Sequence, residues 1–235
     1  MPSPEDLNEV LHLARRLSEP SWSAYVDFLE LRGKGLRQPA LNRLKTFIAQ
    51  AQTWSFAERW NFASTVLGSV QNSQWLRIAL PEPLVRNVLR PVLKEALTHF
   101  PTDPRPAFWL GYENIFVWEA ARGDHQQLDW MREAIHRDAE FQPARELFVS
   151  LLLRGISWAQ HELPSGYLGQ PLEDLEALQE GKHVLSGVSS PARRQELAQE
   201  LEAAQKTARQ YLDFQESGAA SYRFWCDENG LPYFY

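Results

Sequence analysis

Cysteine is almost absent from this chain, in which Cys226 is the only one among 235 residues. A lone cysteine excludes an intramolecular disulfide and any zinc site built from several thiolates. The six histidines are scattered, and no two of them have the i, i+4 spacing that places two imidazoles on one helical face. We therefore expect no metal site, and we expect a protein that needs no oxidising compartment.

Long apolar runs are also absent. No stretch approaches the roughly 18 apolar residues that cross a bilayer, and residues 1–6 lack the basic and apolar regions of a signal peptide. The motifs of phosphate-binding loops, dinucleotide-binding folds and nucleophile elbows are missing as well. We therefore expect a cytoplasmic protein without a membrane partner or cofactor, and one that is not an enzyme.

Basic residues are in deficit, with 24 Lys and Arg against 30 Asp and Glu, which gives a net charge of −6. A negatively charged protein repels the phosphate backbone of nucleic acids. The densest basic groups are two arginine pairs, Arg15-Arg16 and Arg193-Arg194, and both are typical of solvated helix faces. Nucleic acid is therefore not an expected partner.

What the sequence does have is apolar residues at helical spacing. Ser3 and Ser55 begin capping patterns, and prolines mark several first turns. Because Pro91 lies inside the apolar run 81–100, we expect a kink or a break near Arg90. The fold class is therefore predicted to be all-α. Helices are expected at about 4–18, 20–33, 39–51, 55–70, 81–100, 104–122, 124–138, 141–162, 171–186 and 191–217.

The segment 163–171, with two prolines and two glycines, is the densest turn signal in the chain. We expect it to divide a helical-hairpin region over 1–163 from a C-terminal helical pair and aromatic tail over 164–235, the two packed as one compact unit. Six of the fourteen residues 222–235 are aromatic, and Asn229-Gly230 lies between the two aromatic groups. An Asn-Gly pair favours a tight turn, so a small hairpin is predicted in this tail.

The segment 96–111 resembles the junction between two tetratricopeptide repeats. In that family a helix ends in Ala-Leu, a proline follows five residues after the alanine, and the next helix carries Leu-Gly. This chain has Ala96, Pro101, Leu110 and Gly111 at those positions, and Leu-Lys-Glu-Ala-Leu at 93–97 is answered by Met-Arg-Glu-Ala-Ile at 131–135. The resemblance implies an irregular stack of antiparallel helical hairpins, with about nine or ten helices, that binds other proteins.

The resemblance covers residues 88–139 and weakens after them. Gly123-Asp124 looks like the family's corner between helices, but Ala139 stands where a proline is expected and Phe148-Val149 replaces Leu-Gly. The chain is therefore identified as a divergent member of the repeat superfamily. The alternative is an unrelated helical bundle with one repeat-like junction.

Two surfaces are candidates for binding. The helix that begins at Pro104 would present one cation and several aromatic side chains on its inward face, a mixture that anchors peptides and proteins. Polar and aromatic residues also gather at the helix end 158–162 and in the loop after it. The candidate partner-binding residues are Arg105, Phe108, Tyr112, Ile115, Phe116, His161 and Tyr167.

These patterns favour a protein–protein interaction or adaptor module that binds a protein or peptide through a groove lined by its central helices. One alternative is a bacterial immunity protein, whose acidic surface neutralises a toxin or effector by covering a basic surface. A second alternative is an enzyme with a site around His161, Glu162 and Tyr167.

Overall fold

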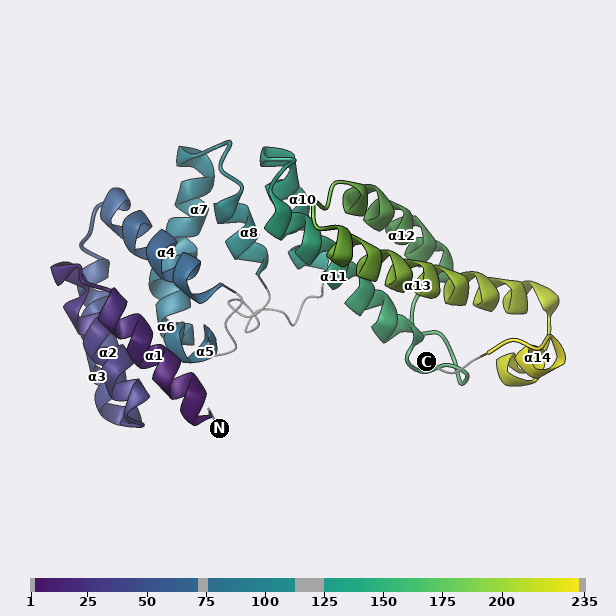
Figure 1. Ribbon diagram of the computed structural model, residues 1–235, viewed down its shortest axis with the longest axis horizontal. Coiled ribbons are helices and arrows are strands. Elements are labelled where there is room, and N and C mark those ends of the chain that lie inside the picture. The colour runs from purple at the N-terminus through teal and green to yellow at the C-terminus, as the bar shows by residue number, and fades with distance from the viewer. Residues whose placement is uncertain (1–2, 72–75, 113–124, 233–235) are drawn as a thin grey trace. The chain divides into compact units, whose positions relative to one another are not determined.

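The computed structural model describes residues 3–71, 76–112 and 125–232. Every regular element in these ranges is a helix and none is a strand, which confirms the all-α class (Figure 1). The chain forms two compact units, Met1–Gly123 and Asp124–Tyr235.

The first unit is built from short helices joined by tight turns. Their bounds are α1 Pro4–Arg16, η1 Pro20–Trp22, α2 Ser23–Gly33, α3 Arg37–Ala51, α4 Phe56–Val70, α5 Leu76–Ala79, α6 Glu82–Leu84, η2 Val85–Leu89, α7 Arg90–His99 and α8 Arg105–Gly111. α1 packs on α2, α2 on α3, α4 on α7, and α7 on α8. Neighbours along the chain are therefore mostly neighbours in space.

Two serine caps begin helices in this unit where the sequence predicted them. The Asp6 backbone N–H donates to the Ser3 hydroxyl at 3.1 Å, and the Ser3 backbone N–H donates to the Asp6 carboxylate at 2.8 Å. Ser55 and Glu58 make the same pair of bonds at the start of α4. The hydroxyl and the backbone N–H of Ser55 both donate hydrogen bonds to the Glu58 carboxylate. These bonds stabilise the charged form and lower the pKa of Glu58.

The irregularity predicted beside Pro91 is a π-helical turn. η2 joins α6 to α7, and the Arg90 backbone N–H donates to the Val85 carbonyl, five residues back. Pro91 has no N–H, and its ring clashes with the preceding turn of a regular α-helix. The wider π turn accommodates the proline without ending the helical path. Asn87 Nδ2 donates to the Pro83 carbonyl at 2.7 Å and so occupies one backbone acceptor of the same segment.

Aromatic rings fill the centre of the first unit. Tyr25, Phe28, Phe47 and Phe62 are fully buried, and neighbouring ring centroids lie 4.7 to 5.7 Å apart. The Tyr25 hydroxyl donates to the Ala79 carbonyl at 2.9 Å, and complete burial raises the pKa of this phenol. The aromatic core therefore ties α2, α3 and α4 to the short α5.

The second unit is a bundle of four helices of 13 to 27 residues, with one short helix near its C-terminus. The elements are α10 His125–Arg137, α11 Gln142–Gln160, α12 Pro171–Ser186, α13 Pro191–Ser217 and α14 Tyr222–Glu228. α11 contacts α10, α12 and α13, and α12 also packs along α13. The bounds predicted for the four long helices agree with the structure to within two residues at each end.

Two glycines let the chain segments of this unit approach closely. A Cβ atom at Gly181 would lie 2.6 Å from Leu152 Cδ2 and 3.2 Å from Leu201 Cδ2, so α12 meets α11 and α13 at this point. A Cβ atom at Gly187 would lie 2.1 Å from a guanidinium nitrogen of Arg145. The turn between α12 and α13 therefore has room for the arginine only because residue 187 has no side chain.

The hairpin predicted in the aromatic tail is wrong, because residues 222–228 form α14. Tyr222 and Cys226, one helical turn apart, are 4% and 0% exposed. The segment therefore buries its apolar side chains with helical rather than alternating period. Gly230, with a φ of 62°, follows the helix in the left-handed conformation. The other members of the cluster around α14 are Leu163, Tyr167, Tyr211, Phe214, Trp225 and Leu231.

The division between the compact units falls at residues 123 and 124, whereas the sequence suggested a boundary at 163 and 164. The loop over 163–171 joins two helices of one unit. The physical reason is that α11, before the loop, packs against both α12 and α13, after it. The dense turn signal therefore marks a tight connection inside a bundle.

Candidate functional site

Of the residues predicted on the central helix, the structure describes Arg105, Phe108 and Tyr112. A helix was expected over 104–122. In the structure α8 ends at Gly111, and the next residue, Tyr112, has extended backbone angles. Glycine is a weak helix former, which favours an end at this position. Phe108 is 2% exposed, and its ring centroid lies 5.2 Å from that of Trp109. Phe108 therefore belongs to the core of the first unit.

Arg105 lies on the surface, away from that core. It is exposed, and its guanidinium forms a bidentate ion pair with the Asp103 carboxylate, with a closest approach of 2.6 Å. The hydrogen bonds that Arg105 donates to the Asp103 carboxylate raise the pKa of the guanidinium. Arg105 Cζ also lies 5.9 Å from the centroid of the Trp60 ring, within range of a cation–π contact. Ile115 and Phe116 lie outside the described residues.

Trp60 belongs to a row of rings on α4 and at the C-terminal end of α7, in which Phe56, Trp60 and Phe100 are half-buried and His99 is exposed. Ring centroids are 5.4 Å apart for Trp60 and Phe100, 5.8 Å for Phe100 and Phe56, and 4.2 Å for Phe56 and His99. The sequence assigns Phe56 and Trp60 to the buried stripe of α4, because both have core spacing. Their partial exposure depends on which helices pack against α4, and the spacing of apolar residues in the sequence does not predict it.

The second predicted surface, at the end of α11, keeps its side chains together. Trp158 is 67% exposed, and its ring stacks on that of His161 with centroids 4.3 Å apart. His161 Nε2 lies 2.9 Å from Glu162 Oε1, and His161 Nδ1 contacts the Trp158 carbonyl. The three side chains therefore form one exposed group at the C-terminal end of the helix, and the histidine holds the tryptophan ring in place.

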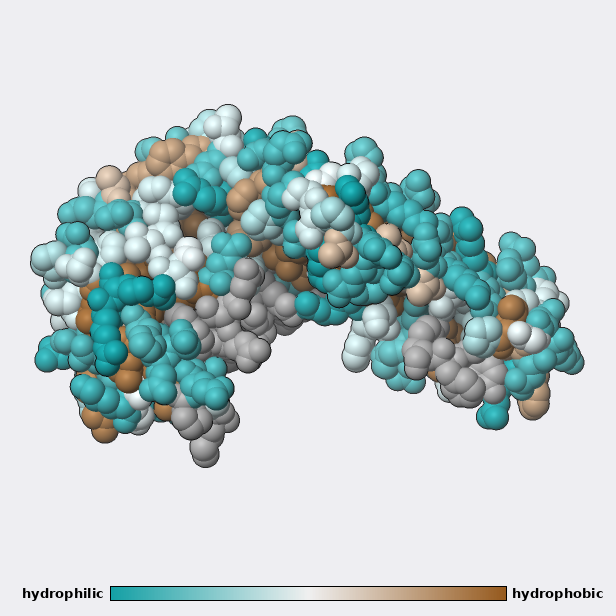
Figure 2. Space-filling view, in the orientation of Figure 1, coloured by the Kyte–Doolittle hydropathy of each residue, from teal (hydrophilic) through white to brown (hydrophobic). Residues whose placement is uncertain are grey.

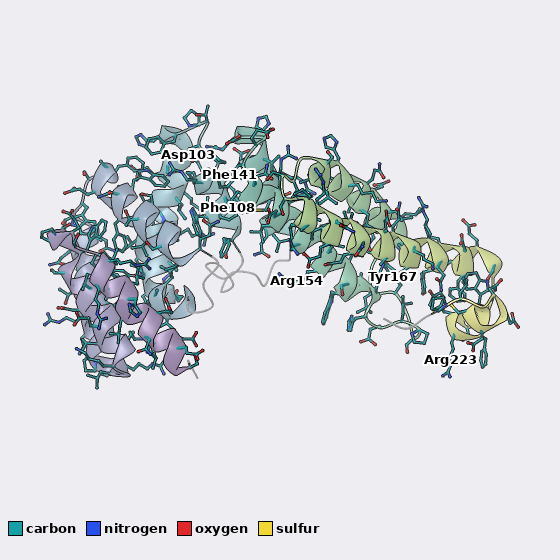
Figure 3. The ribbon with its side chains drawn as sticks, viewed as in Figure 1. Asp103, Phe108, Phe141, Arg154, Tyr167 and Arg223 are labelled. Carbon is teal, nitrogen blue, oxygen red and sulfur yellow. The ribbon has the colours of Figure 1, made fainter. Side chains whose placement is uncertain are left out.

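Tyr167 faces inward and fixes the loop that follows α11 (Figure 3). Its hydroxyl donates to Asp174 Oδ2 at 2.5 Å and accepts from Gln160 Nε2 at 3.3 Å. Gln160 is 4% exposed and also donates to the Ala204 carbonyl at 3.0 Å. Burial raises the pKa of Asp174, and this effect outweighs the hydrogen bond from Tyr167, which lowers it. The network connects the loop to α11, α12 and α13.

Two leucines add exposed apolar surface at the same end of the bundle. Leu168, in the loop, is 55% exposed, and Leu172, in the first turn of α12, is 64% exposed. The Leu168 backbone N–H donates to the Ala159 carbonyl at 2.8 Å, which places the loop alongside the last turn of α11. We call Trp158, Leu168 and Leu172 the exposed apolar cluster. The three residues lie close together in the sequence, between 158 and 172, and apolar exposure concentrated in one segment is typical of contact surfaces.

Carboxylates are the only strongly charged groups near this cluster in the sequence. Residues 155–181 contain five Asp and Glu and no Lys or Arg. Two of the five have structural partners, because Asp174 binds Tyr167 and Glu180 forms an ion pair with Arg132 at 2.7 Å. The remaining three, Glu162, Glu173 and Glu176, are exposed, and none pairs with a Lys or Arg of the described residues.

A shallow groove of about 440 Å³ runs between α11 and α13. Its lining is mostly small and polar, and it includes Arg154, Arg193 and Glu200. Arg193 spans the rim, where it donates to Ser150 Oγ at 3.0 Å and to Glu196 Oε2 at 2.6 Å. The groove therefore carries charges of both signs, and it has no exposed large apolar side chain to anchor a partner.

Three further features concern metal-ligating groups, apolar helices and the single cysteine among the residues that the structure describes. No group of three or more His, Cys, Asp or Glu side chains in that part of the chain could hold a metal ion, and no helix there is long and apolar enough to cross a bilayer. Cys226 is buried, and Gln210 Nε2 donates to its Sγ at 3.2 Å. The visible face of the second unit is mostly hydrophilic (Figure 2), so concentrated apolar exposure is a local feature.

No protein-family model, curated protein or solved structure matches this chain.

Proposed function

We propose that the chain is a protein-binding module built as a divergent tetratricopeptide-like stack of helical hairpins. The packing of α7 on α8 supports the resemblance. Ala96 and Gly111, the small residues expected at the junction, are buried, and Pro101 lies in the turn between the two helices. Small residues at such positions let two helices pack closely, and stacked hairpins present extended surfaces to partners.

The exposed apolar cluster at the α11–α12 end is the observation that carries the binding proposal. Trp158, Leu168 and Leu172 each leave more than half of their surface in water. Covering this area with a partner contributes about 25 cal/mol per Å² of apolar surface. Tryptophan is also one of the residues that most often dominate binding energy at protein interfaces. The site is therefore suited to bind a protein.

The cluster is held in position before any partner arrives. The stacking of His161 fixes the Trp158 ring, and the hydrogen bond to Ala159 fixes the backbone of Leu168. Ordering a mobile side chain on binding costs about 0.5–1.5 kcal/mol, and a preorganised site avoids much of that cost. His161 thus contributes to binding by orienting the tryptophan.

Site-specific photo-crosslinking in the source cell tests this proposal. A photoreactive phenylalanine analogue at position 172 should capture one protein, whereas the same residue at position 36 or 224 should not. Leu36 and Phe224, which are 47% and 70% exposed, are matched controls because they are exposed apolar residues elsewhere. The captured protein, once purified, should bind Trp158→Ser about 30-fold more weakly than wild type. Equal capture at all three positions, or none at 172, would contradict the proposal.

A further inference from the structure

In the sequence, the acidic and basic side chains on both sides of the loop after α11 have one sign, because residues 155–181 contain Asp and Glu but no Lys or Arg. On α12, Leu172 and Glu176 are one helical turn apart and share a face, and Glu173 lies beside them. On the other side, Glu162 follows the end of α11. Exposed carboxylates therefore flank the apolar side chains from both helices.

The loop geometry brings these two sides together. A Cβ atom at Gly169 would lie 3.1 Å from Ala159 Cβ, on α11, and 3.3 Å from Asp174 Oδ2, on α12. The chain at 168–169 is therefore wedged between the last turn of α11 and the first turn of α12. Leu168, which is 55% exposed, precedes this point in the chain, so the loop brings the end of α11 and the start of α12 close to one exposed apolar residue.

We propose that the partner presents a basic amphipathic segment to this surface, with apolar residues for the cluster and Lys or Arg for the flanking carboxylates. The inference rests on the proposed function and specifies the chemistry of its partner. Opposite charges around an apolar centre steer association and reject wrong partners. They also make binding sensitive to salt, because exposed pairs are screened beyond about 10 Å at 0.1 M ionic strength.

Other occupants are disfavoured by the same carboxylates. In a symmetric dimer that used this surface, the acidic patch of one copy would face the acidic patch of the other, because a two-fold interface places a patch against itself. An anionic membrane or a nucleic acid would place phosphates beside them. A basic protein segment is the occupant whose charge complements the surface.

Two designed peptides test the inference on the full chain. One is a labelled 18-residue helix of leucine and lysine, and the other is its leucine and glutamate counterpart. Fluorescence anisotropy should show binding of the lysine peptide only, with an affinity that falls at least tenfold between low salt and roughly 0.5 M salt. Equal binding of both peptides, or preference for the glutamate peptide, would overturn the inference.

Charge variants locate the binding. The triple variant Glu162→Gln, Glu173→Gln and Glu176→Gln should weaken binding of the lysine peptide about tenfold. Its matched control replaces three exposed glutamates elsewhere, Glu9→Gln, Glu202→Gln and Glu216→Gln, with the same loss of net charge. Binding that weakens equally in both variants would show attraction by the net charge alone, and it would overturn the inference.

The captured partner separates failure of the inference from failure of the proposed function. If Trp158→Ser abolishes its binding while the triple glutamine variant binds it as tightly as wild type, the surface binds a protein but not through basic groups. If position 172 captures no protein, the proposed function itself fails. Tight binding to vesicles of anionic lipid that survives the triple variant, or self-association of the full chain through position 172, would also overturn the inference.

Discussion

The two compact units use their aromatic residues in different ways. In the first, Tyr25, Phe47 and Phe62 lie in the centre of the unit and are fully buried. In the second, the core of the four long helices is mainly aliphatic, and most of the described aromatic side chains gather toward the end of the bundle near α14 and the loop after α11. Aromatic side chains therefore build the core in one unit and line an end in the other.

Exposure follows the same division. Of the five exposed large apolar side chains in the described ranges, Leu36 is the only one in the first unit, and Trp158, Leu168, Leu172 and Phe224 are in the second. Burial of such residues stabilises a helical bundle, and exposure of several in one unit is the kind of feature that marks a contact surface. Most of the exposed apolar side chains among the described residues therefore belong to the second unit, while the rings of the first unit are used mainly in its core.

The largest expected effect comes from the aromatic core. Phe62 packs against four other rings, with centroid distances of 4.7 to 6.1 Å. Phe62→Ala should lower the free energy of unfolding by about 3–5 kcal/mol, because it leaves a cavity among rigid rings. The control Phe224→Ala, at a 70% exposed position, should change it by less than about 0.5 kcal/mol. Denaturant titration of both variants measures the difference, and equal effects would refute the contrast between the units.

A smaller effect is expected from the close packing of α12. Gly181→Ala should destabilise the chain by about 1–3 kcal/mol, because its Cβ would meet Leu152 and Leu201. A Cβ atom at Gly155, in the middle of α11, would meet no neighbouring group within 4 Å, so Gly155→Ala should stabilise by up to about 1 kcal/mol. In thermal unfolding, Gly181→Ala should lower the midpoint temperature and Gly155→Ala should raise it. The same sign for both would show that α11, α12 and α13 do not pack as described.

Loss of a helix cap should have a still smaller effect. Ser55→Ala removes the side chain that accepts from the Glu58 backbone N–H at the start of α4, and it should cost about 1 kcal/mol. Ser64, a partly exposed serine inside the same helix, offers a control, since Ser64→Ala should be neutral or slightly stabilising. Urea unfolding midpoints test both variants, and a Ser55→Ala midpoint equal to wild type would contradict the role of the cap.

The smallest effect concerns the pH dependence of the second unit. Burial raises the pKa of Asp174 in the folded protein above its ordinary value of 3.8. The folded state therefore binds this proton more tightly than the unfolded state, so its contribution to stability is complete below that value and is lost as the pH rises through the folded-state pKa. Asp174→Asn should reduce the dependence of the unfolding free energy on pH, measured by urea unfolding from about pH 3 to 7. Parallel curves for the variant and wild type would show no such effect.

The helices of the second unit were predictable because their ends carry local signals. Pro171 and Pro191 occupy the first turns of α12 and α13, and Gly187 and Gly218 follow their last residues. Such signals act within a few residues of the chain, so a sequence reports them directly. The tail shows the limit, because the Asn229-Gly230 pair suggested a hairpin, while the burial of a helical face decided the structure.

The candidate site was predictable only in part. The helix end at 158–162 and Tyr167 were recognised from their composition, but Leu168 and Leu172 were not. Leu172 and Leu178 are both leucines of α12, yet one is 64% exposed and the other 0% exposed. The difference depends on which helices cover each position, and that information is not local. Phe108 was misplaced for the same reason, since an aromatic side chain in a helix fits a core and a binding face equally well.

The amide-exchange footprint of the captured partner on the full chain tests the central claim most directly. Backbone amides in α11's last turns, the following loop and the first turns of α12 should exchange more slowly in the complex than in the free chain. The exchange rates of amides in α4, α7 and α8 should be unchanged. Trp60 lies in α4, Arg105 in α8, and Phe100 directly after α7. Protection confined to α4, α7 and α8, with the segment 158–176 unaffected, would contradict the proposed binding surface. It would indicate that the partner binds to α4, α7 and α8 instead.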